Sequence, residues 1–441
     1  MNPVSGIIAC LGKGPVTTMF NKILDQLEHR APAGYFVYPD LKHLAVKDIK
    51  DERCFLSAVC LRENSNSPPF PFHGSIYEPS SLDITQLKLL LDEARYETLC
   101  KILSEVDGSF AFVNCYSDKL VFARDAIGQK PLFITYSPDF IAICSEFQAL
   151  KFLNKPIISV PPGVLIELSL KARHEYPFSN IQVNPQNIES DEAAIKITNL
   201  LKKSVKARSQ VMDFSTLGFS GGLDSSILAK LISDLTPLKL FCISVRGSRD
   251  SKWAEYAAKL LELDVNVVYV DAVILEKRLN NIRRFLQNCS LMNLSIGLGI
   301  RLASEAAHKV SNSLMVGQLA DELFGGYKKY QVIYQNKGPE ETRRLMVQDV
   351  LSAHVSNFER DELVSAPYVD LISPYASLNL VKYVLQTKTD LHIDPYGQRK
   401  MLLQKVGKII GLPDQLISAP KKAFQYSSGI EKVMKLIISQ K

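Results

Sequence analysis

The segment Ser220–Ser226, with the sequence SGGLDSS, joins an apolar run to a helical pattern. The run before it, 214–219, is predicted to be a buried strand, and 227–232 after it is predicted to start a helix. Two glycines at such a turn let backbone N–H groups approach an anion closely, and the helix N-terminus adds unpaired donors. The segment therefore predicts a strand–loop–helix unit that binds phosphate.

Asp224 is the residue of this segment that does not suit phosphate, because a carboxylate repels it. It fits the site if it holds a Mg²⁺ ion that the phosphates share. The alternative is an ordinary helix start capped by Asp or Ser. No Lys follows the glycines, which excludes the GxxxxGK[ST] loop. The segment instead resembles the pyrophosphate loop SGGxDS of ATP-cleaving ligases that form acyl-adenylates.

Length and composition limit the class of protein. The chain has 441 residues, which suggests two to three domains, and 46% hydrophobic residues suit a globular protein. The net charge of +6 is spread without a Lys/Arg run, so nothing indicates nucleic-acid binding. No signal peptide and no apolar stretch of about 18 residues is present, which argues against a membrane span. Eight Cys without a CxxC pair predict reduced core thiols in a cytoplasmic protein.

The two halves of the chain differ in pattern. Residues 1–170 contain many short β-like runs with few helical stretches, which predicts layered sheets with helices outside, an α+β domain. Residues 171–190 are polar and aperiodic and are predicted to be a linker. In 191–441, strands alternate with helices, which predicts an α/β domain with a doubly wound parallel sheet; from about Asn357 the pattern is helical.

A second informative segment runs from Gly317 to Tyr327, with two acidic residues and a glycine turn after a predicted strand. Ligands of parallel sheets bind beyond the carboxyl ends of the strands, where both this segment and Ser220–Ser226 are expected. Asp321 could therefore give a second Mg²⁺ contact opposite Asp224. The alternative is a helix start with acidic residues in its first turn, which the helix dipole favours.

Together, the two segments resemble the synthetase domain of the asparagine synthetase family, which carries SGGLDSS and SGEGADELFGGY. Further segments are similar to motifs of both family domains, in the same order: Ser5–Ile7, His29–Pro32, His73–Tyr77, Asp107–Phe112, Ala123–Leu132, Ser145–Glu146, 247–250, Asn357–Asp361, Ser373–Tyr375 and Pro420–Phe424. The resemblance covers nearly the whole chain. Its end, 423–428, is most similar to archaeal asparagine synthetases and asparagine synthetase domain-containing proteins.

The resemblance implies a glutamine amidotransferase type 2-like domain over 1–170, with the αββα layers of the N-terminal-nucleophile fold. It implies a HUP-like ATP pyrophosphatase domain over 191–441, with a helical C-terminus. With ATP and Mg²⁺, that domain would adenylate the side chain of aspartate. Ammonia would then give asparagine, AMP and pyrophosphate.

The resemblance also implies roles for single residues. The residues that would hold pyrophosphate and Mg²⁺ are Ser220, Gly221, Gly222, Asp224, Ser225 and Ser226, with Asp321 sharing the metal. Phe219, Ile243 and Gly317 would line the nucleotide pocket. Lys421 would stabilise charge on the α-phosphate as pyrophosphate leaves.

The glutaminase motifs depart from the family pattern at four positions. The nucleophilic Cys, which the family exposes as its first residue, is Ser5 here, with four residues before it. A serine hydroxyl needs a dedicated base, and no free α-amine lies beside it. His73 replaces the oxyanion-hole Asn before Gly74. The Arg that binds the glutamine carboxylate in the family has no clear match, with Arg62 as the candidate, and Asp83 follows at a shortened spacing for the amine-binding Asp. We therefore predict that the first domain folds but does not hydrolyse glutamine.

The synthetase motifs depart as well. Gln318 stands at the family's catalytic Glu and cannot take a proton at neutral pH, so Asp370 is the candidate acceptor for the proton that ammonia loses. Ile372 and Ser377 replace an Arg and an Asp of the RVPFLD motif. These changes leave two alternatives to an ammonia-dependent asparagine synthetase: a ligase for another carboxylate, as β-lactam synthetases are, and a non-catalytic scaffold. A homodimer or a separate glutaminase partner is compatible with the sequence.

Overall fold

The computed structural model describes residues 4–31, 33–38, 42–44, 53–61, 68–179, 181–246, 248–418 and 428–439. The chain divides into two compact units. Unit 1 comprises Met1–Asn180 and His354–Pro367, and unit 2 comprises Ile181–Ala353 and Tyr368–Lys441. The segment expected to be a linker, 171–190, contains strand β12 (Arg173–Pro177), which pairs along its whole length with its neighbour β11 (Val164–Ser169).

Unit 1 contains two antiparallel sheets. Across the first, the strands follow the order β10 (Ile158–Ser159), β8 (Phe133–Tyr136), β9 (Phe140–Cys144), β1 (Val4–Gly12), β4 (Phe55–Leu61), β2 (Tyr35–Tyr38) and β3 (Lys42–Leu44). Across the second, they follow the order β12, β11 (Val164–Ser169), β7 (Lys119–Arg124), β6 (Asp107–Cys115) and β5 (Phe72–Glu78).

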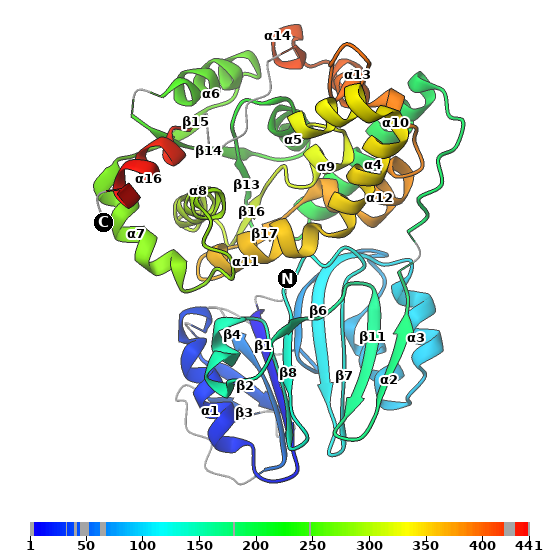
Figure 1. Cartoon of the computed structure of the whole chain (residues 1–441), viewed down its shortest axis with the longest axis vertical. Coiled ribbons are helices and arrows are strands. Elements are labelled where there is room, and N and C mark those ends of the chain that lie inside the picture. Colours follow the sequence, from blue (N-terminus) through cyan, green and yellow to red (C-terminus); the bar gives the residue numbers. More distant parts are fainter. Residues whose placement is uncertain are drawn as a thin grey trace. The chain divides into compact units, whose positions relative to one another are not determined.

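Two apolar cores stack these sheets between helices. Alternate residues of both sheets, such as Ile7 of β1 and Phe122 of β7, form the core between them. The opposite face of the second sheet packs against helices α2 (Ile84–Asp92) and α3 (Tyr96–Leu103). Helix α1 (Thr17–Gln26) contacts β1 of the first sheet (Figure 1). The predicted αββα layering is confirmed.

Buried ion pairs hold residues 354–367 in unit 1. This segment forms a π-helical turn (His354–Phe358) and α11 (Glu359–Ser365). Glu359 accepts hydrogen bonds from Arg124 Nη1 at 3.0 Å and from Ser159, and Glu362 pairs with Lys130 at 2.6 Å. The side chains of both ion pairs are at most 3% exposed. Arg124 and Lys130 both come from Ala123–Leu132, so this motif secures a distant part of the chain.

Unit 2 is built on one parallel sheet (Figure 1). Its strands follow the order β15 (Val265–Val270), β14 (Leu238–Val245), β13 (Ser215–Gly218), β16 (Ser313–Met315) and β17 (Asp370–Ile372). The chain runs outward from β13 to β15 and then returns to β16 on the other side of β13. The strand order therefore reverses between β13 and β16, which is where such sheets bind ligands.

Helices surround this sheet, as the α/β prediction required. They are α4 (Ser190–Ser209), α5 (Leu223–Ser233), α6 (Arg249–Leu260), α7 (Ala272–Arg283), α8 (Leu291–Ala307), α9 (Ala320–Leu323), α10 (Lys328–Leu351), α12 (Leu378–Val384), α13 (Met401–Ile409), α14 (Asp414–Ile417) and α16 (Ile430–Ser439). From about Asn357 the chain is mainly helical, as predicted, and β17 is a short strand within this part that the sequence pattern did not indicate. That strand is three residues long and too short for a periodic signal, and its pairing with β16 completes the sheet.

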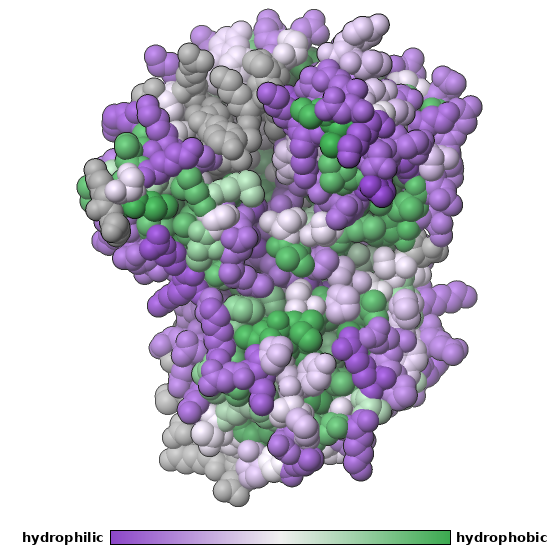
Figure 2. Space-filling model, in the orientation of Figure 1, coloured by the Kyte–Doolittle hydropathy of each residue, from purple (hydrophilic) through white to green (hydrophobic). Residues whose placement is uncertain are grey.

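The surface gives no sign of a membrane-spanning helix. Within the described ranges, every helix is too short or too polar to cross a bilayer. On the face in Figure 2, hydrophilic side chains alternate with limited apolar patches. Single exposed apolar residues are normal on protein surfaces.

We predict that Glu359→Ala lowers the free energy of unfolding of unit 1 by about 3 kcal/mol, because Arg124 keeps its buried charge without its carboxylate partner. Hydrogen exchange of β7 and β10, read by mass spectrometry, measures the loss locally. The matched control is Asp139→Ala, which removes the exposed Lys13–Asp139 pair and should cost less than about 1 kcal/mol. Equal losses in both variants would contradict the structural role of the buried pair.

Candidate active site

The loop after β13 has a backbone that requires glycine at its centre. Gly221 has φ +72°, and a Cβ there would lie 2.9 Å from both Ala257 Cβ and Trp253 Cδ1. The indole Nε1–H of Trp253 donates a hydrogen bond to Gly221 O at 2.9 Å. Helix α6 therefore packs against the outside of the loop and fixes its shape.

The serines of the loop form a small polar cluster at the start of α5. The N–H of Ser220 donates to Ser225 Oγ at 3.3 Å, and Ser225 Oγ donates to Gly222 O at 3.1 Å. No side chain caps the N-terminus of α5, and the buried Ser226 hydroxyl has no hydrogen-bond partner among the described residues. Unused donors at a helix N-terminus fit a phosphate group.

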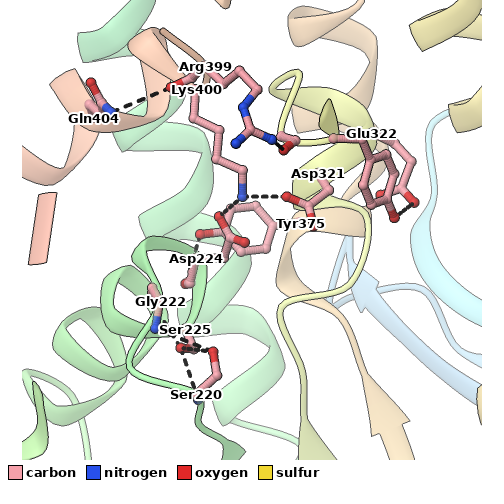
Figure 3. A network of polar contacts seen from close by, with 12 residues as sticks. Ser220, Gly222, Asp224, Ser225, Asp321, Glu322, Tyr375, Arg399, Lys400 and Gln404 are labelled. Carbon is pink, nitrogen blue, oxygen red and sulfur yellow. Dashed lines mark hydrogen bonds and ion pairs between the residues drawn. The ribbon is translucent and has the colours of Figure 1, made fainter. Parts of the chain in front are cut away.

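Two carboxylates and one ammonium group meet beside this loop (Figure 3). Asp224, in the first turn of α5, and Asp321, on α9, both direct Oδ1 at the Nζ of Lys400. The Asp321–Lys400 contact is 2.6 Å. The side chain of Lys400 is 4% exposed, so this cation is almost fully withdrawn from water.

The convergence follows from the reversal of strand order. Asp224 follows β13 and Asp321 follows β16, and these neighbouring parallel strands end at the same edge. Gly326 leaves the space that the contact needs: a Cβ there would lie 1.9 Å from Asp321 Oδ1 and 2.3 Å from Lys400 Cε. Arg399 Nη1 donates to Gly326 O at 2.5 Å and ties the turn to the residue before Lys400.

The segment after β17 supports both sides of the site. Tyr375 donates its hydroxyl hydrogen to Asp224 O at 3.0 Å, and Ser373 donates to Gln318 O at 2.8 Å. Burial first, and then the charges of Asp224 and Asp321, raise the pKa of the Tyr375 phenol well above its ordinary value. Tyr375 therefore stays protonated and remains a hydrogen-bond donor.

The two carboxylates also fit a divalent cation. Carboxylate oxygens are the ligands that Mg²⁺ prefers, and here two of them already point at one positive centre. The Lys400 ammonium group stands in for the metal in this arrangement. The acidic pair predicted from the sequence is thus brought together.

The other predicted residues of unit 2 differ in where they lie. Phe219 and Ile243 are buried near the strand ends, and a Cβ on Gly317 would lie 3.4 Å from Asp224 Cβ. Asp370 is the first residue of β17 and pairs with Ser313, so it lies at the amino end of the strand, away from the edge that holds Asp224.

Three further positions complete the comparison with the expected site. Ile372 and Ser377, which replace the Arg and Asp of the family motif, are both buried. Lys421 lies outside the described residues.

The predicted glutaminase residues of unit 1 have structural contacts. The backbone of Ser5 lies within strand β1, which pairs with β4. Gly74 has φ +110°, and a Cβ there would lie 2.0 Å from Ser109 O, while His73 beside it is buried. Asp83 is exposed and caps α2 by accepting from Thr85 N–H at 3.2 Å.

The buried thiols of unit 1 are poor substitutes for the nucleophile. Burial raises the pKa of Cys144 to about 12, and it also raises the pKa of Cys10 and Cys60. All eight Cys are free, as predicted, but Cys54 and Cys289 are exposed and not core residues. Both lie outside regular elements, where the apolar context of the sequence does not require burial.

A buried ion pair lies beside strand β1 in unit 1. Arg30 and His29 both contact Glu146, the His29 Nε2–Glu146 Oε1 distance being 2.7 Å. The Arg30 and His29 charges hold the pKa of Glu146 below its ordinary value, against the opposing effect of burial. The motifs His29–Pro32 and Ser145–Glu146 thus keep a structural function.

Sequence reasoning missed Lys400, Tyr375 and the loop contact of Trp253. Tyr375 lies in a segment already singled out, so its motif was a usable signal. Lys400 lies in no segment that resembled the family motifs. A single Lys between Arg399 and Met401 carries no local signal of burial.

Comparison with known proteins agrees with this geometry. Residues 196–354 match the family model for asparagine synthase, and residues 80–152 match one for a glutamine amidotransferase domain. The chain is 30% identical to a putative glutamine-hydrolysing asparagine synthetase of Methanocaldococcus jannaschii, over 75% of this chain and 71% of that protein. The chain belongs to the asparagine synthetase family. It is accordingly an ATP-dependent carbon–nitrogen ligase.

Other members of the family match more weakly but over similar lengths. The asparagine synthetase of Gallus gallus is 26% identical, over 75% of this chain and 65% of that protein. An asparagine synthetase domain-containing protein of Saccharomyces cerevisiae is 24% identical, over 95% of this chain and 90% of that protein. The family thus extends over both units.

We predict that Gly326→Ala lowers the rate of the ATP-dependent ligase reaction by about 100-fold, because the added Cβ displaces Asp321 and Lys400 by roughly an ångström. ATP consumption by purified protein measures the effect. Gly14→Ala is the control, since a Cβ there has no heavy atom within 4 Å and φ is not positive. A Gly326→Ala variant with normal turnover would show that the Asp321–Lys400 contact is not needed.

His392 generates a second prediction. Its ring is buried, Nε2 contacts Thr387 Oγ1 at 2.7 Å, and its carbonyl accepts from the N–H of Met401 beside Lys400. Burial, and to a lesser extent the Arg343 charge, lowers the pKa of His392 to about 3. Below its unfolded value of about 6.5, only the unfolded chain takes up this proton, so stability falls as pH falls.

Between pH 7 and pH 5 this group should therefore remove about 2 kcal/mol of stability from unit 2. His392→Asn should abolish that part of the pH dependence, whatever its effect at pH 7. The measurement is urea unfolding followed by Trp253 fluorescence at both pH values, with the exposed His308 changed to Asn as the control. An unchanged pH slope in the His392 variant would refute the prediction.

Proposed function

We propose that this protein forms asparagine from aspartate and free ammonia, with ATP converted to AMP and pyrophosphate, and that it does not use glutamine itself. The observation that carries the proposal is the arrangement at the reversal of strand order in unit 2. There the Ser220–Ser226 loop, Asp224 and Asp321 are gathered at one edge of the sheet. Cleavage of ATP between its α- and β-phosphates requires such groups, namely donors that bind the phosphates and carboxylates that hold a cation.

In the proposed reaction, the aspartate side-chain carboxylate attacks the α-phosphate and pyrophosphate leaves. The loop glycines Gly221 and Gly222, with Ser220, Ser225 and Ser226, would hold the pyrophosphate through N–H and O–H donors. Asp224 and Asp321 would hold Mg²⁺, which neutralises phosphate charge when bound. Lys421 would stabilise the charge on the α-phosphate as pyrophosphate leaves.

The nucleotide and the acceptor would be held by neighbouring residues. Phe219 and Ile243 supply apolar surface for the adenine, and Gly317 leaves room beside Asp224. Gln318 would orient ammonia or the acyl-adenylate by hydrogen bonding but cannot take a proton. Asp370, the proton acceptor predicted from the sequence, begins β17 at the end of the strand away from Asp224, so it does not lie at this edge to accept the proton.

The loss of glutaminase activity is proposed from the motifs and contacts of unit 1. Ser5 lies within a strand, Asp83 caps a helix, and the buried thiols with raised pKa values hold little thiolate at neutral pH. A separate glutaminase, or a second copy of this chain, remains compatible with this proposal as a partner.

A second candidate function is adenylation of a different carboxylate. The observation that favours it is the pair of buried residues Ile372 and Ser377, which lack the charges expected for binding aspartate. A scaffold without catalysis is the third reading, which the intact loop and acidic pair oppose.

The test is pyrophosphate release from ATP and Mg²⁺, with aspartate present or absent, ammonium or glutamine as nitrogen source, and product identified by mass. Asparagine from ammonium only is the expected result. Asparagine from glutamine would overturn the proposal for unit 1. ATP binding without aspartate-dependent pyrophosphate would favour another carboxylate, and absence of ATP binding would favour the scaffold.

We further predict that Ser5→Ala leaves ammonium-dependent synthesis within about twofold of the unchanged protein, because the hydroxyl takes no part in catalysis. Asp224→Asn is the matched comparison and should lower synthesis at least about 100-fold, because it removes a carboxylate ligand of the Mg²⁺ that the phosphates would share. A large loss in the Ser5 variant, with its fold intact by circular dichroism, would contradict the assignment.

A further inference from the structure

Lys400 occupies an unusual position for a lysine. Its ammonium group is almost completely buried and contacts Oδ1 of both Asp224 and Asp321 (Figure 3). Its backbone is left-handed, with φ +59° and ψ +29°, at the residue before α13. A non-glycine residue pays for that conformation with about 1–2 kcal/mol, so the surrounding structure must hold it there.

The two oxygens that Lys400 holds are the same two that a divalent cation would need. Together the two carboxylates and the ammonium group have a net charge of −1. A metal ion cannot take both Oδ1 atoms while Nζ stays between them, because the cations would share one position and repel each other. Binding of the metal therefore requires the ammonium group to move.

A lysine is suited to such a movement. Its charge is compact and sits on a flexible four-carbon stem, whereas the planar Arg group would be held by several fixed hydrogen bonds. Once displaced, a buried ammonium group needs a new anionic partner. The polyphosphate of a nucleotide, bound at the neighbouring Ser220–Ser226 loop, would supply that partner.

We propose that Lys400 is a displaceable counter-ion that makes divalent-cation binding depend on nucleotide. Without nucleotide it neutralises Asp224 and Asp321 and holds them in place. With nucleotide, its ammonium group turns to the polyphosphate and releases the two carboxylates to the metal. Lys400 is thus a positioning residue of the site. The inference rests on the proposed Mg²⁺–ATP chemistry.

Direct metal binding tests this proposal without measuring turnover. Mn²⁺ serves as the probe and is titrated into the full chain, followed by electron paramagnetic resonance, with and without α,β-methylene-ATP. Without nucleotide, Lys400→Met should bind Mn²⁺ at least about tenfold more tightly than the unchanged protein, because no internal cation competes. Nucleotide should raise the Mn²⁺ affinity of the variant less than it raises that of the unchanged protein. Mn²⁺ bound by free nucleotide is subtracted in both cases.

Two further variants provide controls. Lys405→Met removes an exposed lysine of α13, paired with Asp191, and should leave Mn²⁺ binding unchanged. Lys400→Arg keeps a positive charge between the acids and should keep the nucleotide-free Mn²⁺ affinity low. Circular dichroism shows whether Lys400→Met folds. If it does not, Lys400→Arg still tests the proposal.

Equal or weaker nucleotide-free Mn²⁺ binding by a folded Lys400→Met protein would overturn the proposal. So would tight nucleotide-free Mn²⁺ binding by both the unchanged protein and Lys400→Arg. If the expected Mn²⁺ pattern holds but no asparagine is formed, the counter-ion role stands and the proposed product is wrong. If no variant binds Mn²⁺ even with nucleotide, both the metal site and the counter-ion role are refuted.

Discussion

The side-by-side ends of β13 and β16 are the constraint on which unit 2 depends. Parallel strands that end at one edge deliver their loops to one place, and here each loop carries an acidic residue. Two carboxylates so close repel each other unless a cation lies between them. Lys400 supplies the positive charge, and Gly326 leaves the space that the contact needs. The Tyr375 hydroxyl fixes the backbone at Asp224.

The motifs of unit 1 contain residues whose contacts stabilise the fold. The motif residues that survive there make buried ion pairs, such as Arg30 with Glu146 and Arg124 with Glu359. Removing one partner of such a pair leaves a buried charge, which is strongly unfavourable, so these residues are difficult to replace singly. The family's nucleophile position holds Ser5 here, and the backbone at that position still forms part of β1. Stability and catalysis therefore constrain different residues of the same motifs.

Much of this could be read from the sequence because the signals were local. SGGLDSS between an apolar run and a helical pattern specified the loop, and the alternation of strands with helices specified the parallel sheet. The exceptions were also physical. β17 is too short to show a period, and β12 is polar because it lies at an exposed edge of its sheet. Residues 354–367 join unit 1 through side-chain contacts, such as Arg124–Glu359 and Lys130–Glu362, between residues more than 200 positions apart.

The sequence by itself determined the phosphate loop, the two acidic residues, the order of strands and helices, and the departures at Ser5 and Gln318. These depend on residue type and on spacing over a few turns, which the chain carries locally. Only the tertiary structure decided that Lys400 lies between Asp224 and Asp321 and that Asp370 begins a strand at the opposite end. Such contacts arise where strands distant in sequence pair, and no local pattern encodes which lysine among many becomes buried against them.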